Sequence, residues 1–239
     1  MLNEIRERIK KYVNFEINEF LLIILLGLII GFIIGVDDGR ANASIDIFWY
    51  KHFFSSFIAA FIAIFVNIIT LKTYGIYLGY KITYKFNSIG NLIALIISFL
   101  SYGKIMFFVP GGFESKIIPH LRFGKFRFGP NLFDEAKIGL LSLISNIVIA
   151  SLLKSFFPQT ILVKNIIIAN ILYAIYGILP LPKTNIGLNI LSFSPKFYLF
   201  SLYFVVITAL LVFLVSPLFC FLLGALLGFI AYLNTYKKL

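Results

Sequence analysis

FLLIILLGLIIGFIIGV, residues 20–36, contains no charged side chain. A run of this length and composition is typical of a helix that crosses a lipid bilayer, because such a helix needs about 20 apolar residues. The basic residues before the run and Ala41-Asn42-Ala43 after it also resemble a signal peptide with its cleavage site. We favour a retained span, because the apolar run is long for a signal peptide and Asp37-Asp38 follow it at once.

The remainder of the chain has the same apolar character. Of 239 residues, 60% are apolar and 13% are charged, and the mean hydropathy is +0.98. Average soluble chains have about 45–50% apolar and about 25% charged residues. Since six spans of about 20 residues use about half of such a chain, no sizeable soluble domain fits beside them. We expect residues 1–19 to form an interfacial N-terminal segment and residues 20–235 to form a single transmembrane domain.

Further apolar stretches follow the first at residues 53–71, 91–109, 138–153, 165–179 and 197–233. Ser216-Pro217 interrupts the last of these, and a proline there either kinks one helix or divides two. Residues 76–86 (IYLGYKITYKF) are rich in β-formers and too polar to cross, so they predict a strand or a hairpin. Residues 121–129 (LRFGKFRFG) resemble an edge strand. The prediction is a polytopic α-helical membrane protein with six or seven transmembrane helices and short membrane-associated β-strands between the second and fourth spans.

The formal net charge of +11 would point to nucleic acid in a soluble protein. Here the basic residues lie between or beyond the apolar runs, where they set the orientation of the chain and contact anionic lipid headgroups. We therefore expect anionic headgroups as partners and no nucleic acid. The basic residues divide almost evenly between the two sides of the predicted spans, and we assign the N-terminus to the cytoplasm.

Ionisable side chains inside the membrane usually mark function, and here they are scarce. No Asp or Glu lies within an apolar run, and Lys104 is the only clearly internal charge. An aspartyl protease of the membrane needs two embedded aspartates, and a zinc protease needs two histidines one helical turn apart. His52 and His120 are too far apart in sequence for such a pair. We expect no metal and no cofactor, and a divergent hydrolase that uses His52 or His120 remains an alternative.

Five sequence segments nevertheless follow one another in an order that can be compared with a known family. They are FIAAFIAIFVNIITLKTYG at 57–75, the polar β-like segment from residue 76, VPGG at 109–112, KIGLLSLISN at 137–146 and LPLPKTN at 179–185. This order resembles the site-2 protease family of intramembrane zinc metalloproteases, which occurs in compact form in archaea. The family's landmarks are a helix with H-E-x-x-H that ends in a basic residue and Tyr-Gly, membrane-associated strands, a Pro-Gly turn, G-K-[IV]-x-[LI]-A-G-P-x-x-N and L-[IL]-P-[IL]-P-P-L-D-G. The resemblance covers about residues 20–195.

The departures from that family concern its catalytic groups. The H-E-x-x-H positions fall on Ala63, Ile64 and Asn67, and Asn185 stands where the family has its third zinc ligand, an aspartate. An alanine cannot bind zinc, and an isoleucine cannot take a proton from water. Asn146 matches the asparagine of the family's helix-opening motif. The resemblance implies a pseudoenzyme in the cell membrane of a prokaryote that binds or regulates a membrane protein partner, with Asn67, Asn146 and Asn185 in its groove.

Two other interpretations stay open. The three asparagines also suit ordinary hydrogen bonds between helices, which contribute about 1 kcal/mol or less each. A small transporter or channel would use Lys104, the Gly and Pro breaks and the asparagines to line a path. A continuous polar cavity that reaches both faces would favour the transporter, and a closed core between the second, fourth and fifth spans would oppose it.

Overall fold

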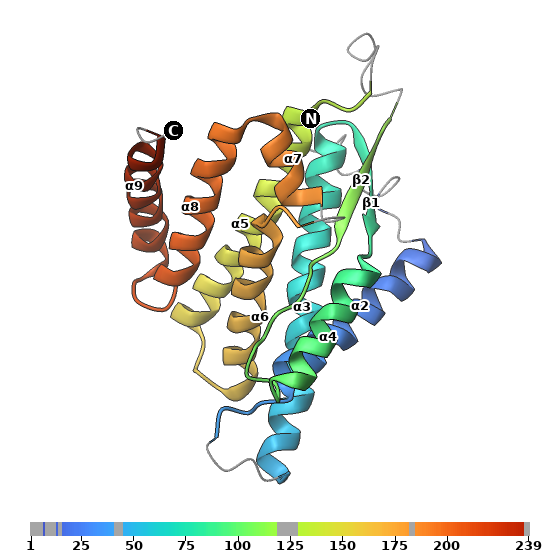
Figure 1. The fold of residues 1–239 in the computed structure, drawn as a ribbon, viewed down its shortest axis with the longest axis vertical. Helices are drawn as coiled ribbons and strands as arrows, with labels where there is room; N and C mark the ends of the chain where they lie inside the picture. The colour runs from blue at the N-terminus through green and yellow to red at the C-terminus, as the bar shows by residue number, and fades with distance from the viewer. Residues whose placement is uncertain are drawn as a thin grey trace.

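The computed structural model of the chain describes residues 7, 13, 16–40, 45–118, 129–181 and 185–236. Helices dominate it, and Figure 1 shows their arrangement: α2 (Ile17–Gly35), α3 (Ile47–Tyr77), α4 (Ser88–Leu100), α5 (Leu132–Phe156), α6 (Ile161–Ile178), α7 (Asn185–Phe193), α8 (Pro195–Leu211) and α9 (Pro217–Tyr236). Two strands, β1 (Tyr80–Lys85) and β2 (Gly112–Ile117), lie at one end of the bundle.

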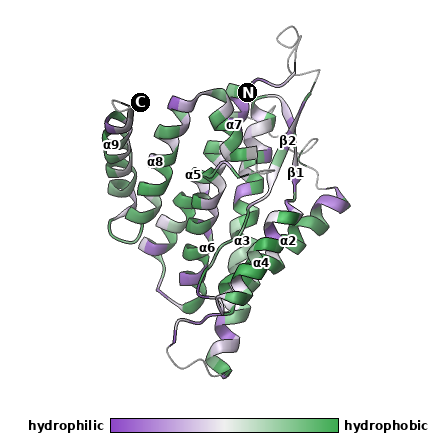
Figure 2. Cartoon of the chain, viewed as in Figure 1, coloured by the Kyte–Doolittle hydropathy of each residue, from purple (hydrophilic) through white to green (hydrophobic). Residues whose placement is uncertain are grey.

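In the part of the chain that the structure describes, five helices are long and apolar enough to cross a membrane: α2, α3, α5, α6 and α9. The helices α4 and α8 are apolar but shorter. The outer faces of the helices are apolar (Figure 2), as shown by Leu218, Leu222 and Leu226 on α9, which are 68%, 60% and 56% exposed. Water disfavours so large an apolar surface, and lipid does not. The prediction of a mostly helical chain with several apolar helices of membrane-spanning length is confirmed, and this architecture fits a polytopic membrane protein.

Residues 91–109, the predicted third span, do not form one helix, and the chain turns close to Gly103-Lys104, where the sequence predicts an interruption. α4 has 13 residues and is about 20 Å long, which is less than the hydrocarbon thickness of about 30 Å. It ends in a tight turn, where Tyr102 and Gly103 have φ angles of 53° and 79° and Gly103 N–H donates to the carbonyl of Ser98. Beyond the turn the chain is not helical, and Phe107 and Phe108 pack on Tyr176 of α6. This packing accounts for the apolar sequence of the segment. Lys104 is exposed beside this turn, so it is not an internal charge.

The last apolar stretch forms two helices. α8 ends at Leu211 and α9 begins at Pro217. A proline has no backbone N–H and clashes with the preceding turn, so it cannot continue α8, yet it suits the first position of α9. The sequence predicts that Pro217 either kinks one helix or divides residues 197–233 into two, and the structure shows two helices.

The sheet lies between α3 and α5 in the chain, as predicted. β1 and β2 are antiparallel, with Tyr80 opposite Ile117 and Lys85 opposite Gly112. β1 is buried at every second residue, so one of its faces packs on the bundle. The predicted strand at 76–86 is therefore confirmed over Tyr80–Lys85, β2 was not predicted, and the edge strand expected at 121–129 falls almost wholly outside the described residues.

α2 packs closely on α3 through three glycines spaced by four residues. Gly27, Gly31 and Gly35 face the phenylalanines Phe61, Phe57 and Phe53 of α3. A Cβ atom on Gly31 would lie 2.8 Å from the Cα of Phe57, so the two backbones nearly touch. Such small residues at every fourth position are typical of transmembrane helix contacts. α2 is thus an integral helix of the bundle.

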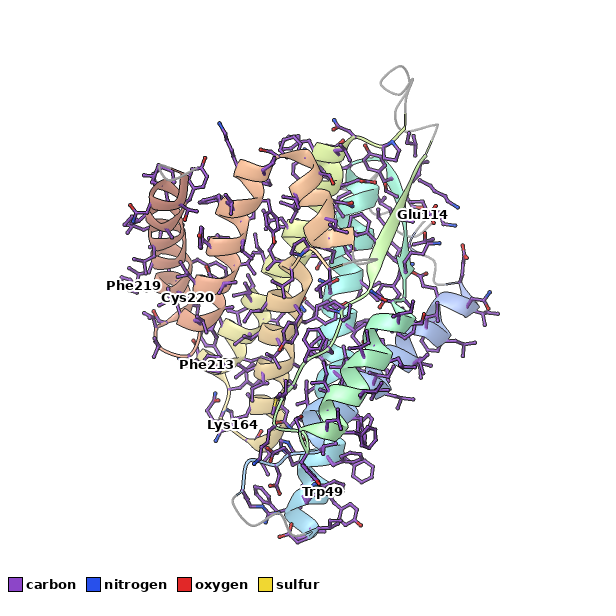
Figure 3. The ribbon with its side chains drawn as sticks, viewed as in Figure 1. Trp49, Glu114, Lys164, Phe213, Phe219 and Cys220 are labelled. Carbon is purple, nitrogen blue, oxygen red and sulfur yellow. The ribbon has the colours of Figure 1, made fainter. Side chains whose placement is uncertain are left out.

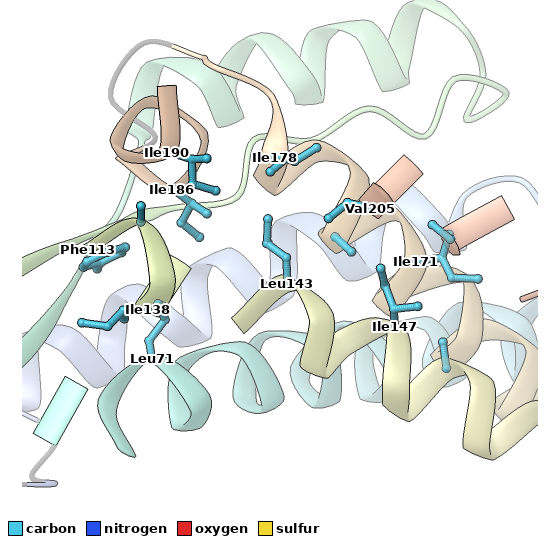
Figure 4. Packing of buried hydrophobic residues seen from close by; sticks show 14 of the residues in the cluster. Leu71, Phe113, Ile138, Leu143, Ile147, Ile171, Ile178, Ile186, Ile190 and Val205 are labelled. Carbon is cyan, nitrogen blue, oxygen red and sulfur yellow. The ribbon is translucent and has the colours of Figure 1, made fainter. Parts of the chain in front are cut away.

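Two apolar clusters form the core. One joins α2, α3 and α6, and the other joins α5, α6, α7 and α8. Figure 4 shows the second cluster, in which Leu143 and Ile147 of α5 lie near Ile171 of α6 and Ile186 of α7. Because α6 belongs to both clusters and α3 contacts both α5 and α6, these three helices form the centre of the molecule.

Candidate functional site

Three of the predicted site residues lie on α3 and face the centre of the bundle. Ala63, Ile64 and Asn67 are each 1% exposed or less. Asn146 of α5 reaches the same place, because its Nδ2 donates to the Ala63 carbonyl at 3.2 Å. In an α-helix that carbonyl also accepts the N–H of the residue four positions later, here Asn67. The structure therefore brings Asn67 and Asn146, hereafter the central asparagine pair, to within one helical turn of each other.

The central asparagine pair is short of hydrogen bonds. Among the described residues, Oδ1 and Nδ2 of Asn67 and Oδ1 of Asn146 have no partner, although both side chains are fully buried. A buried polar group without a partner costs about 1–3 kcal/mol. Asparagine is therefore a costly choice at position 67 for packing alone, and a buried site of this kind suits a water molecule or a polar partner.

A groove runs between α3 and α5 beside this pair. It has a volume of about 500 Å³. Its lining comes from two helices: Phe65, Val66, Ile69 and Thr70 of α3, and Leu141, Ile144, Ser145, Val148 and Ile149 of α5. We call it the α3–α5 groove. Phe65 and Leu141, at 52% and 38% exposed, show that it opens to the surroundings of the bundle.

The polar side chains in the α3–α5 groove are two hydroxyls. Thr70 Oγ1 donates to Ser145 Oγ at 3.0 Å, and Ser145 Oγ donates to the carbonyl of Ser142 at 2.7 Å. Thr70 follows Asn67 by three residues, and Ser145 directly precedes Asn146. The groove and the central asparagine pair therefore lie at the same level along α3 and α5. The groove is on the outer surface of the bundle, and the pair is in its core.

Asn185 lies on a different helix from the central asparagine pair. It is the first residue of α7, and its side chain lies outside the described part of the chain. The next residue, Ile186, packs on Gly139, where an added Cβ would lie 3.1 Å from its side chain. Gly139 precedes Asn146 by two helical turns, or about 10 Å. α7 therefore packs on α5 about two turns before Asn146.

His52 binds helices together. Its Nε2 lies 3.3 Å from the carbonyl of Ile34 on α2, and its Nδ1 lies 3.3 Å from Nδ2 of Asn165 on α6. A neutral ring that donates from Nε2 and accepts at Nδ1 satisfies both contacts. Asn165 also donates to Ser55 and Ser56. These contacts place the ring of His52 between α2 and α6.

The hydrolase alternative has no metal cluster to use in the described residues, where no three His, Cys, Asp or Glu side chains gather. His120, the other histidine considered for it, lies outside these residues.

A buried ion pair escaped the sequence analysis. Lys72 Nζ lies 2.7 Å from Glu19 Oε2, with the side chains only 3% and 6% exposed. Glu19 Oε1 also accepts the N–H of Tyr84 at 2.8 Å, so the pair joins α2, α3 and β1. The sequence does contain one indication that Lys72 is buried. It follows Ile64 and Ile68 at a spacing of four residues, which places all three on one face of a helix.

Further polar contacts fix the sheet against α5. Tyr80 Oη donates to Asp134 Oδ2 at 3.1 Å, and Ser115 donates to Glu135. Across the strands, Lys85 lies 2.8 Å from Glu114. This bond raises the pKa of Lys85 and lowers that of Glu114. The sheet is therefore held in one place relative to the groove-forming helices.

Comparison of the chain with models of protein families, with curated proteins and with solved structures finds no match. The likeness to site-2 proteases therefore rests on the order of sequence landmarks, and the function is argued from the geometry of this chain alone.

Proposed function

We propose that this chain is a non-catalytic membrane protein that holds a transmembrane helix of a partner protein in the α3–α5 groove. The observation that carries the proposal is the groove itself, which lies near the middle of two membrane-spanning helices. At that depth only lipid tails and other transmembrane helices can reach it.

The shape of the groove favours a helix over a lipid tail. From Leu141 to Ile149 it extends along α5 for about 12 Å, or two turns, which is enough for one ridge of a partner helix. The small side chains of Thr70 and Ser145 allow a second backbone to approach closely, as at other transmembrane helix contacts. Their hydroxyl oxygens also retain lone pairs that a polar side chain of the partner can use.

The non-catalytic part of the proposal is supported by chemistry. Ala63, Ile64 and Asn67 stand at the positions that correspond to H-E-x-x-H, and none of these side chains can bind zinc and activate a water molecule as the family's groups do. The protein is then a protease-like scaffold that binds or regulates its partner.

We also propose six crossings, formed by α2, α3, α5, α6, α8 and α9. α8 has 17 residues and a length of about 26 Å, close to the thickness of the hydrocarbon core. α4 and the extended chain after it then form a hairpin that begins and ends on the sheet side, with its tip at Gly103 beside Asp37 at the opposite end of the bundle. Measurement of the accessibility of cysteines introduced at Lys104 and Lys116, in intact cells and in broken cells, tests this topology.

With six crossings, most basic residues belong to segments on the sheet side, which the positive-inside rule assigns to the cytoplasm. These residues are Arg6, Arg8, Lys10, Lys11, Lys81, Lys85, Lys116, Arg122, Lys125, Arg127, Lys137, Lys183, Lys196, Lys237 and Lys238. The other side has Arg40, Lys51, Lys104, Lys154 and Lys164. From the sequence, we expect the basic residues to divide almost evenly between the two sides of the membrane. That expectation counts residues 91–109 as a crossing. The proposed location is the cytoplasmic membrane of a prokaryote, with the N-terminus inside.

A transporter or channel is less well supported. The residues at the centre of α3, α5 and α6 are buried, including Ala63, Asn146 and Asn170 at 1% exposed or less. This closed core gives a solute no path between these helices, whereas the α3–α5 groove is open on its outer side.

Filling the groove tests the proposed function. Ser145→Phe places a ring in the groove, and Ser155→Phe makes the same change on the exposed end of the same helix. Each tagged full-length variant is purified from its native membranes in mild detergent, and the associated membrane proteins are quantified by mass spectrometry. We expect a partner that Ser155→Phe retains and Ser145→Phe loses. Identical sets of associated proteins in both variants would refute the groove as the binding site.

A further inference from the structure

A second pocket lies at the end of the bundle remote from the sheet, where α5 turns into α6. It has a volume of about 230 Å³. Its lining residues are Lys154, Gln159, Lys164, Ile167, Ile168 and Phe213. We call it the α5–α6 pocket. Figure 3 shows Lys164 and Phe213 at the same end of the molecule, far from Glu114 of the sheet.

Two lysines, Lys154 and Lys164, line this pocket, and no acidic residue does. Within the described residues, neither Lys154 nor Lys164 lies within ion-pair distance of a carboxylate, in contrast to Lys72, Lys85 and Lys137, which are all paired. An anion at the mouth of this pocket would be attracted by both lysines.

The position of Lys164 is unfavourable for its own helix. α6 begins at Ile161 after the N-cap Thr160, so Lys164 lies in the first turns, where the helix dipole is positive. Lys154 lies in the last turn of α5, where a cation is favourable. Snorkelling of a long side chain toward the membrane surface explains Lys154 well. Snorkelling does not explain why a second lysine, Lys164, lines the same pocket from the N-terminal end of α6, where the helix dipole disfavours a cation.

Apart from Gln159, whose amide donates to the carbonyls of Lys154 and Phe157, the rest of the lining is apolar. Ile167 and Ile168 lie one turn further along α6, and Phe213, which is 50% exposed, follows α8. A ligand for this site therefore needs an anionic head for the lysines and an apolar body for the isoleucines and the phenylalanine. A phospholipid has both parts, and basic pockets between transmembrane helices are known to hold anionic headgroups.

We infer that the α5–α6 pocket binds an anionic phospholipid, with its phosphate between Lys154 and Lys164 and an acyl chain against Ile167, Ile168 and Phe213. The inference is independent of the helix-binding role, because the pocket shares no residue with the α3–α5 groove.

Native mass spectrometry of the full-length protein tests the inference. The protein in detergent is titrated with phosphatidylglycerol and, separately, with zwitterionic phosphatidylcholine. Lys154→Ala/Lys164→Ala removes both charges of the pocket. Lys51→Ala/Lys104→Ala is the matched control, because it removes two exposed lysines from the same end of the molecule. A further titration adds inorganic phosphate in excess.

We expect one tightly held phosphatidylglycerol and no equivalent phosphatidylcholine. Each basic residue near an anionic headgroup contributes about fivefold to affinity, so the pocket variant should bind about 25-fold more weakly. The control variant should bind as the unaltered protein does. Equal retention of the two lipids, or equal losses in the two variants, would overturn the inference. Displacement of the lipid by inorganic phosphate would also overturn it, because the site would then recognise free phosphate.

Discussion

Replacement of Lys72 by methionine removes one partner of the buried pair that joins α2, α3 and β1. The carboxylate of Glu19 would keep its hydrogen bond from the N–H of Tyr84 but lose its counter-charge, although only 6% of the side chain is exposed. Removal of one member of a buried ion pair costs about 3–5 kcal/mol, since an uncompensated charge is left in the interior. We expect the free energy of unfolding of Lys72→Met to fall by about that amount.

The double variant Glu19→Met/Lys72→Met gives the sharper result. It leaves no buried charge, and its main cost is the unpaired N–H of Tyr84, which is worth about 1–3 kcal/mol. The double variant should therefore be more stable than Lys72→Met alone. A double-mutant cycle isolates this coupling.

Reversible unfolding in mixed detergent micelles, followed by circular dichroism, measures these differences. The control is Lys81→Met, because Lys81 pairs with Glu16 at 3.2 Å on an exposed surface. Such pairs contribute about 0–1 kcal/mol. A cycle in which the two single changes simply add, or a Lys72→Met variant as stable as Lys81→Met, would refute the reasoning.

Three further predictions concern other parts of the molecule. Gly31→Ala should lower the free energy of unfolding by about 1–3 kcal/mol, because the added Cβ atom would lie 2.8 Å from the backbone of α3. Unchanged stability would contradict that close contact. Asn67→Leu should raise it by about 1–3 kcal/mol in the same assay, because two unpaired amide atoms leave the core; a loss would mean that the amide has a partner. The contacts of Arg40, and then the N–H of Trp49, lower the folded pKa of Asp46 below its unfolded value of about 4. Its carboxylate therefore stabilises the start of α3 above that pH, and this contribution is lost as the pH falls through the folded pKa. The emission of Trp49, the single tryptophan, should change only in acid, and Asp46→Asn should remove that change.

The sequence predicted the helices whose apolar runs continue unbroken, and it failed where the backbone turns. Hydropathy counts apolar residues, but it does not show whether the helix continues through them. In residues 91–109 the helix ends at Leu100, and the apolar residues Phe107 and Phe108 are buried by packing on α6. The same limit applies to β2, whose sequence contains Glu114 and Lys116 and becomes a strand only by pairing with β1.

At the candidate site, the sequence indicated Asn67 and Asn146 as residues on facing helices, and the structure places them together. It could not indicate the α3–α5 groove, because a groove depends on how two helices cross. In the sequence, Glu19 and Lys72 lie next to the ends of apolar runs, and only the three-dimensional arrangement of α2, α3 and β1 buries them against each other. Their charges were visible in the sequence, but their burial was not.

The central claim is that the α3–α5 groove holds a partner's helix, and residue-specific photocrosslinking in native membranes tests it most directly. A photoreactive phenylalanine analogue replaces Ile144 in the groove or, as a control, the lipid-facing Leu226 of α9. We predict one protein adduct of defined mass from position 144, absent from position 226 and abolished by Ser145→Phe. The same adducts from both positions, or adducts with lipid alone from position 144, would contradict the account.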